Sequence, residues 1–119
     1  MDRYRKDRGD QGESLAVDFL RRNGVDILER NYRYSRYGEI DIIGRKDPYL
    51  IFFEVKSRST RAYGGPLYSI SENKKKTLRK IARHYLSCHP EFNTVDIICR
   101  FDLIAIMNGD ISWIEDIIR

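Results

Sequence analysis

Apolar positions follow a helical period in two parts of the chain. Between residues 12 and 23 one apolar stripe is followed by Gly24 as a stop, and it consists of Leu15, Ala16, Phe19 and Leu20. A second stripe follows Ser69 and Glu72, which have capping-box spacing, and ends before Pro90. It consists of Leu78, Ile81, Ala82, Tyr85 and Leu86. The pattern therefore predicts two amphipathic helices.

The remaining apolar segments are short and rich in β-branched and aromatic residues, which is typical of strands. We expect about five strands, over residues 25–34, 38–45, 50–56, 95–107 and 112–118. Lys46-Asp47-Pro48-Tyr49 reads as a four-residue hairpin loop, and Asn108-Gly109-Asp110 is a strong turn sequence. Strands combined with two helices predict an α/β fold.

The two central strands carry charges inside otherwise apolar runs. If residues 46–49 form a hairpin loop, paired positions sum to 95, and Asp41 lies opposite Glu54. Lys56 follows two residues later on the same face of its strand. The other face would be wholly apolar, with Ile40, Ile42, Ile51, Phe53 and Val55. Because both faces then carry core residues, we expect helices on both faces of the sheet.

Length and composition describe a single globular domain. The chain has 119 residues, of which 41% are apolar and 34% charged. We expect residues 1–10 to be a loose segment and residues 11–119 to form the domain. No signal peptide and no membrane-spanning run are predicted. Cys88 and Cys99 match no metal-binding spacing, and we interpret them as ordinary buried thiols of a cytoplasmic protein.

The net charge of +4 is unevenly distributed along the chain. Residues 1–55 are neutral overall and residues 85–119 carry −4, whereas residues 56–84 carry +8. The basic side chains of this middle segment are Lys56, Arg58, Arg61, Lys74, Lys75, Lys76, Arg79, Lys80 and Arg83. Such a field attracts phosphates, although a solvated helix face is an equally good explanation of the cluster alone. Its position directly after Glu54 favours a site for a polyanion.

Two carboxylates and an ammonium group on one patch indicate a metal site with a catalytic base. Mg²⁺ typically takes one or two carboxylates and completes its shell with water and phosphate oxygens. Asp41 and Glu54 would supply the carboxylates, and the carbonyl of Val55 would add a ligand. Lys56 would position or deprotonate the attacking water, or offset developing negative charge. Glu13 would contribute a third carboxylate if the first helix packs over this face.

Each of these assignments has a structural alternative. Asp41 and Glu54 could pair with Lys56 and Arg58 as a structural ion cluster. Glu13 could be no more than a favourable charge at a helix N-terminus. We interpret Glu39 as an edge or solvent charge, because a site that needs both Glu39 and Asp41 would crowd one strand.

Several ordered motifs resemble a known family over about residues 12–106. They are Gly12-Glu13-Ser14-Leu15-Ala16, residues 27–33, Gly38-Glu39-Ile40-Asp41, Phe53-Glu54-Val55-Lys56-Ser57-Arg58, Lys74 and Arg100-Phe101-Asp102. The chain resembles the YraN-like family of uncharacterised bacterial proteins. That family looks like a branch of the PD-(D/E)xK nuclease superfamily, close in layout to archaeal Holliday junction resolvases. In this chain Gly-Glu-Ile-Asp replaces the Pro-Asp dipeptide of the motif.

The resemblance implies a restriction-endonuclease-like mixed sheet flanked by helices. It also implies Glu13, Asp41 and Glu54 as metal ligands and Lys56 as the catalytic lysine, with Lys74 projecting from the following helix toward the site.

We therefore expect a Mg²⁺- or Mn²⁺-dependent endonuclease that hydrolyses phosphodiester bonds in DNA, including branched or structured DNA. DNA contacts are assigned to Arg58, Arg61, Lys74, Lys75, Lys76 and Arg79. By analogy with resolvases we expect a homodimer. The alternative is a nucleic-acid-binding or complex-assembly protein that retains the fold without turnover. A nucleotide-processing enzyme is less well supported, because the chain has no glycine-rich phosphate loop.

Overall fold

One five-stranded sheet forms the centre of the computed structural model, which describes residues 2–58 and 69–118, and only the backbone of residues 2–10. The elements in chain order are α1 (Asp2–Arg22), β1 (Asp26–Tyr34), η1 (Ser35–Tyr37), β2 (Gly38–Lys46), β3 (Tyr49–Arg58), α2 (Glu72–Cys88), η2 (Pro90–Phe92), β4 (Ile98–Met107) and β5 (Asp110–Ile114). None of these helices is long and apolar enough to cross a membrane.

The strands lie in the sheet in the same order as in the sequence. Only β3 and β4 run parallel, and α2 lies between them in the chain; the other neighbouring pairs are antiparallel. The sheet is therefore mixed, as the family resemblance implied, and α2 forms the crossover that the parallel pair needs.

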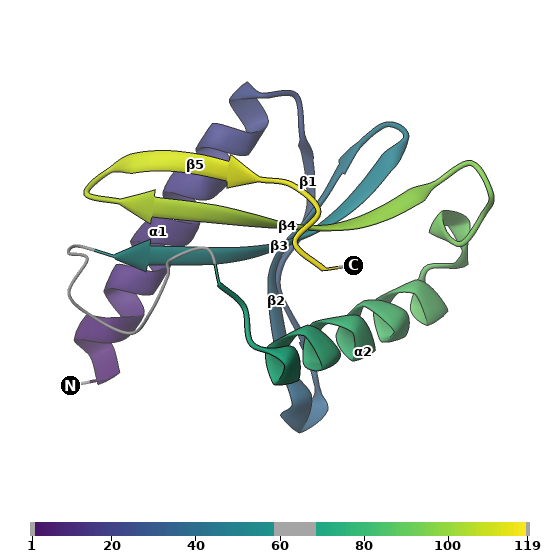
Figure 1. Ribbon diagram of the computed structural model, residues 1–119, viewed down its shortest axis with the longest axis horizontal. Helices are drawn as coiled ribbons and strands as arrows, with labels where there is room; N and C mark the ends of the chain where they lie inside the picture. Colours follow the sequence, from purple (N-terminus) through teal and green to yellow (C-terminus); the bar gives the residue numbers. More distant parts are fainter. Residues whose placement is uncertain (1, 59–68, 119) are drawn as a thin grey trace.

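The two helices cover opposite faces of the sheet (Figure 1). On one face α1 packs through Ala16, Val17 and Leu20 against a core that includes Ile51, Phe53 and Ile104. On the other face α2 packs through Leu78, Ile81 and Tyr85 against a core that includes Ile43, Leu50 and Phe52. This arrangement confirms the α/β prediction and the prediction of helices on both faces.

The predicted register of the central hairpin is confirmed over most of its length. The partners run from Lys46↔Tyr49 to Ile42↔Phe53, and every pair sums to 95. The connecting turn contains only Asp47 and Pro48, two residues fewer than we expected.

The prediction of one wholly apolar sheet face is wrong at Ile40. Ile40 lies in the core under α2 with Ile43, whereas Ile42 lies in the core under α1. The simple alternation fails because the β1–β2 ribbon is irregular here. Asn31, between the partners of Ile40 and Ile42, has a left-handed φ of 54°.

Several element ends differ from the sequence prediction. Helix α1 begins at Asp2, whereas the apolar stripe predicted a helix from about residue 12. Ser71, rather than Ser69, caps α2, because its side chain accepts a hydrogen bond from the Lys74 N–H at 3.1 Å. The prediction that Cys88 and Cys99 are buried is also wrong. Both are exposed, since they lie at the end of α2 and the start of β4.

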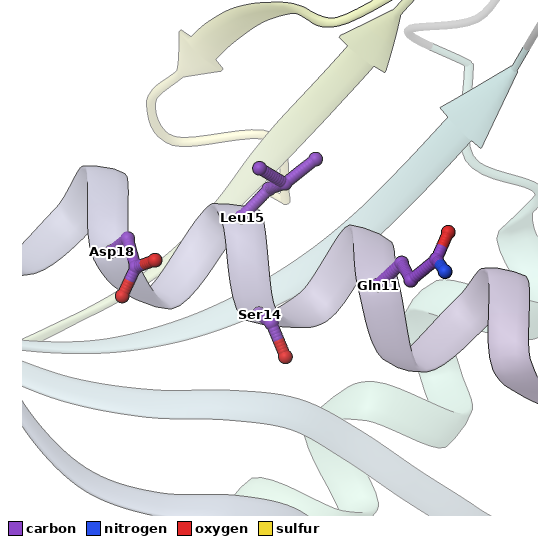
Figure 2. Close-up of a pocket in the computed structure, with 4 residues that line it drawn as sticks. All are labelled: Gln11, Ser14, Leu15 and Asp18. Atoms are coloured by element: carbon purple, nitrogen blue, oxygen red, sulfur yellow. The ribbon is translucent and has the colours of Figure 1, made fainter.

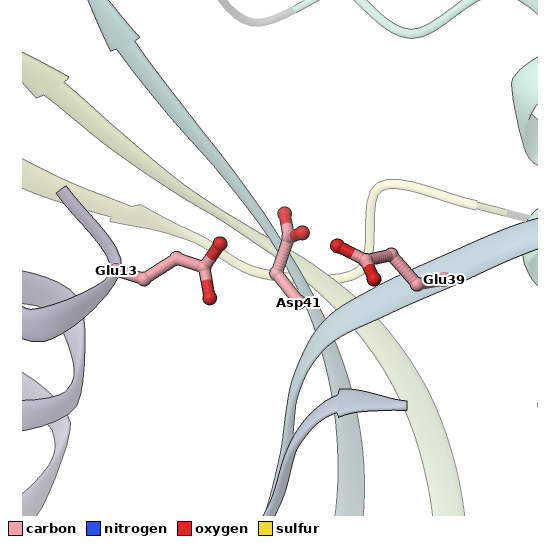
Figure 3. Close-up of side chains that lie close together, drawn as sticks. All are labelled: Glu13, Glu39 and Asp41. Atoms are coloured by element: carbon pink, nitrogen blue, oxygen red, sulfur yellow. The ribbon is translucent and has the colours of Figure 1, made fainter. Parts of the chain in front are cut away.

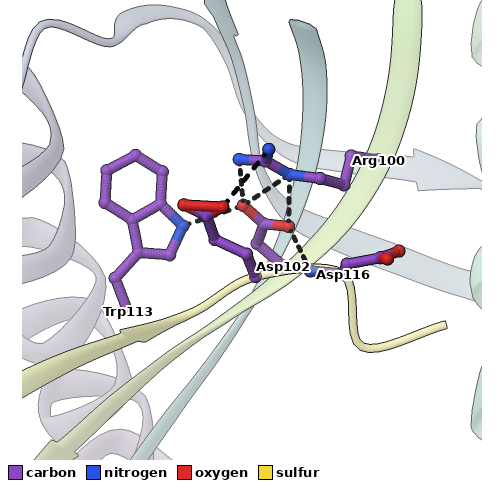
Figure 4. Close-up of polar contacts among 5 residues, drawn as sticks. Arg100, Asp102, Trp113 and Asp116 are labelled. Carbon is purple, nitrogen blue, oxygen red and sulfur yellow. Dashed lines mark hydrogen bonds and ion pairs between the residues drawn. The ribbon is translucent and has the colours of Figure 1, made fainter.

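A buried ion pair, whose carboxylate accepts several hydrogen bonds, fixes the C-terminal segment to the sheet (Figure 4). Asp102 on β4 is fully buried and accepts two hydrogen bonds of 2.9 Å from Arg100. The Trp113 indole and the Asp116 N–H each donate to the same carboxylate at 2.8 Å. Because the Asp102 carboxylate is occupied by these contacts within the fold, we assign Arg100 and Asp102 of the Arg100-Phe101-Asp102 motif a role in stability.

We expect Asp102→Asn to destabilise the fold by about 3–5 kcal/mol, because it leaves a poorly exposed guanidinium with only the exposed carboxylate of Glu115 as a counter-charge. A matched control exists in Asp47, which pairs with Arg45 at the same i, i+2 spacing but is 74% exposed. Asp47→Asn should cost less than about 1 kcal/mol. Urea unfolding measures both free energies of unfolding, and equal losses would contradict this assignment.

Candidate metal-binding site

Asp41 lies where β2 and β3 separate. The ladder between them ends at the pair Ile42↔Phe53, so no strand carbonyl of β2 takes the next N–H of β3. Instead the N–H of Val55 donates to Asp41 Oδ2 at 2.8 Å. The carboxylate therefore takes the place of a ladder acceptor, and this bond holds Asp41 beside the strand that carries Glu54 and Lys56.

Helix α1 brings Glu13 to the same place. The helix can approach β3 closely at Gly12, where an added Cβ would lie 3.3 Å from the Cβ of Ser57. Glu13 follows directly and points toward Asp41 (Figure 3). One carboxylate oxygen from each of Glu13, Glu39 and Asp41 lies within 4.8 Å of the other two, and all three residues are half-buried.

Glu39 is the residue that sequence reasoning missed. We expected a solvent charge, but it points toward Asp41 from the same strand (Figure 3). The signal was present in the sequence, because residues at i and i+2 of a strand lie on the same face. The bend of β2 relieves the crowding that we expected from two acidic side chains on one strand.

Glu54 is buried, with 9% of its surface exposed, and it lies between Asp41 and α2. It shares a hydrogen bond with the Asp41 carboxyl, and its Oε2 lies 3.2 Å from the Nζ of Lys74. Lys74 thus reaches the carboxylates from the first turn of α2, the place where the helix dipole disfavours a cation.

Lys56 lies beside this group, and its ammonium donates to the carbonyl of Ser69. Burial lowers the pKa of Lys56, and the nearby charges of Arg58 and Lys74 lower it further, against the opposing effect of Glu54. A lowered pKa makes an ammonium group a better proton donor and its amine a more available base.

The pKa of Asp41 is raised to about 8. Burial is the largest cause, followed by the hydrogen bond from Glu54 and the negative charges of Glu54 and Glu13. The Val55 N–H acts in the opposite direction but is outweighed. A carboxylate in this setting is stabilised by either a proton or a cation.

The other predicted DNA contacts surround the carboxylates less closely. Lys75 pairs with Glu72 at 3.2 Å, and Arg79 is half-buried. Lys76 and Arg58 are exposed. Arg61 lies outside the described residues.

A separate open cavity of about 430 Å³ lies along α1 and is lined by Gln11, Ser14, Leu15 and Asp18 (Figure 2). Its lining contains one carboxylate, and none of the residues that surround Asp41 contributes to it. We therefore place the candidate site at the separation of β2 and β3 and not in this cavity.

The mixed sheet with one helix on each face fits a restriction-endonuclease-like fold. The family model described as uncharacterised protein family UPF0102 matches residues 12–106, and the chain belongs to this family. This confirms the YraN-like resemblance.

Similar proteins cover nearly the whole chain. A UPF0102 protein of Shewanella sediminis is 42% identical over 92% of this chain and 90% of its own length. A UPF0102 protein of Shewanella oneidensis is 41% identical over 91% of this chain and 95% of its own length.

We expect the stability of the metal-free protein to fall as the pH rises from about 4 to about 8. In this window folded Asp41 holds a proton that the unfolded chain has lost, so the unfolded state binds fewer protons. The slope for one proton is at most about 1.4 kcal/mol per pH unit. Asp41→Asn should flatten this slope, measured by urea unfolding with a chelator present.

Asp47→Asn removes an exposed carboxylate and should leave the slope unchanged. A variant Asp41→Asn with the wild-type slope would show that the raised pKa of Asp41 does not control stability.

Proposed function

We propose that this protein is a metal-dependent nuclease that hydrolyses phosphodiester bonds in DNA. The observation that carries the proposal is the cluster of carboxylate oxygens from Glu13, Glu39 and Asp41, with Glu54 and its partner Lys74 beside Asp41. The family description names no activity, so the proposal rests on the chemistry of these side chains.

The donor set fits a hard divalent cation such as Mg²⁺ or Mn²⁺. Such ions prefer carboxylate oxygens, and oxygens on opposite sides of Mg²⁺ lie about 4.2 Å apart, twice the metal–oxygen distance. Glu13, Glu39 and Asp41 already have oxygens within 4.8 Å of one another. Glu54 would join them by exchanging its contact with Lys74, and the Val55 carbonyl remains a proposed ligand.

In the proposed reaction a bound cation supplies charge stabilisation at the phosphate and a water of lowered pKa. Asp41 and Glu13 orient that site from the sheet and from α1. Lys56, with its lowered pKa, holds the attacking water or gives a proton to the developing oxyanion. Lys74 is then free to contact a phosphate oxygen, since the Glu54 carboxylate has another partner.

We expect Mn²⁺ to raise the melting temperature of the wild-type protein at pH 8, because a ligand that binds only the folded state stabilises it. Glu13→Gln and Asp41→Asn should each remove most of this shift. Asp47→Asn changes the β2–β3 turn, at the opposite end of β2 from Glu39 and Asp41, and should keep the shift. Thermal unfolding with and without Mn²⁺ measures the effect, and equal shifts in all four proteins would contradict metal binding at this site.

We expect cleavage of DNA in a panel of duplex, single-stranded, flap and four-way substrates with Mg²⁺ or Mn²⁺. Asp41→Asn and Lys56→Ala should lower the rate by at least about 100-fold, a typical contribution of general acid–base catalysis. Lys46→Ala removes a lysine that lies over the Trp113 ring, far along β2, and serves as the control. Cleavage that survives both site variants would contradict the proposal.

A non-catalytic role has one observation in its favour. Glu54 is already paired with Lys74, and Lys56 with the Ser69 carbonyl, as in a structural ion cluster. A DNA-binding or assembly protein of this kind would bind DNA with strong salt dependence, and Glu54→Gln would not weaken its binding. It would show no metal-dependent shift in melting temperature. A homodimer remains a proposal in either case.

A further inference from the structure

The turn between β1 and β2 presents an aromatic ring to solvent. Tyr37, the last residue of η1, is 46% exposed. Lys80 of α2 holds its Nζ 4.1 Å from the centre of this ring. An exposed ring can stack on a planar ligand, and the neighbouring ammonium can contact an anionic group of the same ligand.

Tyr37 is the outer member of a row of rings that is anchored to α2. Its ring lies 5.3 Å from that of Tyr34, which stacks on His84 at 3.9 Å with planes 10° apart. The His84 Nδ1 is within hydrogen-bond distance of the Tyr32 hydroxyl, at 2.7 Å. The inner rings are half-buried, so they hold Tyr37 in place but leave its own ring accessible.

The backbone of this turn is shaped for close contact with α2. Ser35 and Gly38 have φ values of 52° and 126°, and the second is a conformation that favours glycine. A Cβ added to Gly38 would lie 3.8 Å from Thr77 and 3.9 Å from Ile81, both on α2. The tip is therefore seated on the helix that also carries Lys80.

The turn adjoins the carboxylate site. Glu39 follows Tyr37 by two residues and points toward Asp41 (Figure 3). Arg33 is the ladder partner of Glu39 and is exposed, as is Arg36 beside Tyr37. Residues 33–37 contain these two cations and no acidic side chain. A DNA backbone bound at the carboxylates would thus lie near further cations at the turn.

We propose that Tyr37 stacks on an unpaired nucleobase of the DNA, with Lys80 and Arg36 on the adjoining phosphates. The proposal rests on the nuclease function and narrows its substrate class to DNA with unpaired bases beside the cut. Stacking on one ring suits a base that has left the helix, because bases inside a duplex already stack on each other. Lys80 can move from the ring to a phosphate, since its stem is flexible.

The test is binding of a fluorescently labelled 16-nucleotide single strand in a chelating buffer, measured by anisotropy. Tyr37→Ala should weaken binding between about 5-fold and 150-fold, the range for one base stacked on an aromatic ring. Tyr37→Phe keeps the ring and should stay within about twofold of the wild type. Ile98→Ala, which trims another half-exposed apolar side chain, should have no effect.

A strand of abasic nucleotides separates stacking from charge, because it keeps the phosphates and lacks the bases. The wild type should bind it as weakly as Tyr37→Ala binds the normal strand, and Tyr37→Ala should lose little more. Equal binding by the wild type and Tyr37→Ala, or equal losses for Tyr37→Ala and Tyr37→Phe, would overturn the proposal. Binding without metal is independent of cleavage, so a failure of the nuclease proposal would show separately, in the cleavage panel.

Discussion

The separation of β2 from β3 at Asp41 is the constraint on which the site depends. A continuous ladder would place backbone where the carboxylates now meet, but here the Asp41 side chain accepts the N–H of Val55. This bond satisfies the donor that the missing ladder would leave unpaired, so the strands separate without losing a hydrogen bond. Side chains from both helices then enter the gap, Glu13 from α1 and Lys74 from α2.

The sheet holds two aspartate environments of opposite kind, one fully buried at Asp102 and one half-buried at Asp41. Asp102 is surrounded by donors, from Arg100, Trp113 and the Asp116 N–H, so its charge is compensated within the fold. Asp41 faces Glu13 and Glu54, and its pKa is raised to about 8 because burial and these neighbours disfavour its charge. Residues arranged for stability alone would be expected to resemble Asp102. At Asp41 the charged form is instead disfavoured, and a bound cation would relieve this electrostatic cost.

The sequence predicted the elements and the central register because these follow from local patterns. A short turn at Pro48 fixes which residues of β2 and β3 pair, and apolar periodicity assigns both helices to their faces. The face of Ile40 could not be predicted, since it depends on the left-handed Asn31 in a neighbouring strand. Glu39 was misassigned for another reason: its i, i+2 spacing placed it beside Asp41, but its approach to Glu13 depends on how α1 packs on the sheet.

The β1–β2 ribbon carries parts of both the proposed metal site and the proposed base-stacking site. It carries Glu39 and Asp41 on the carboxylate side and Tyr37 at its tip, and the tip is held against α2 through Gly38. If a base stacks on Tyr37, the distance from that base to the phosphate at the carboxylates is set by a paired ribbon and not by a loop. Ribbon geometry is stiffer than loop geometry, because every second pair of facing residues is joined by two backbone hydrogen bonds. The position of the cut relative to the unpaired base would then be a property of the fold, and the bend at Asn31 would be the feature that determines it.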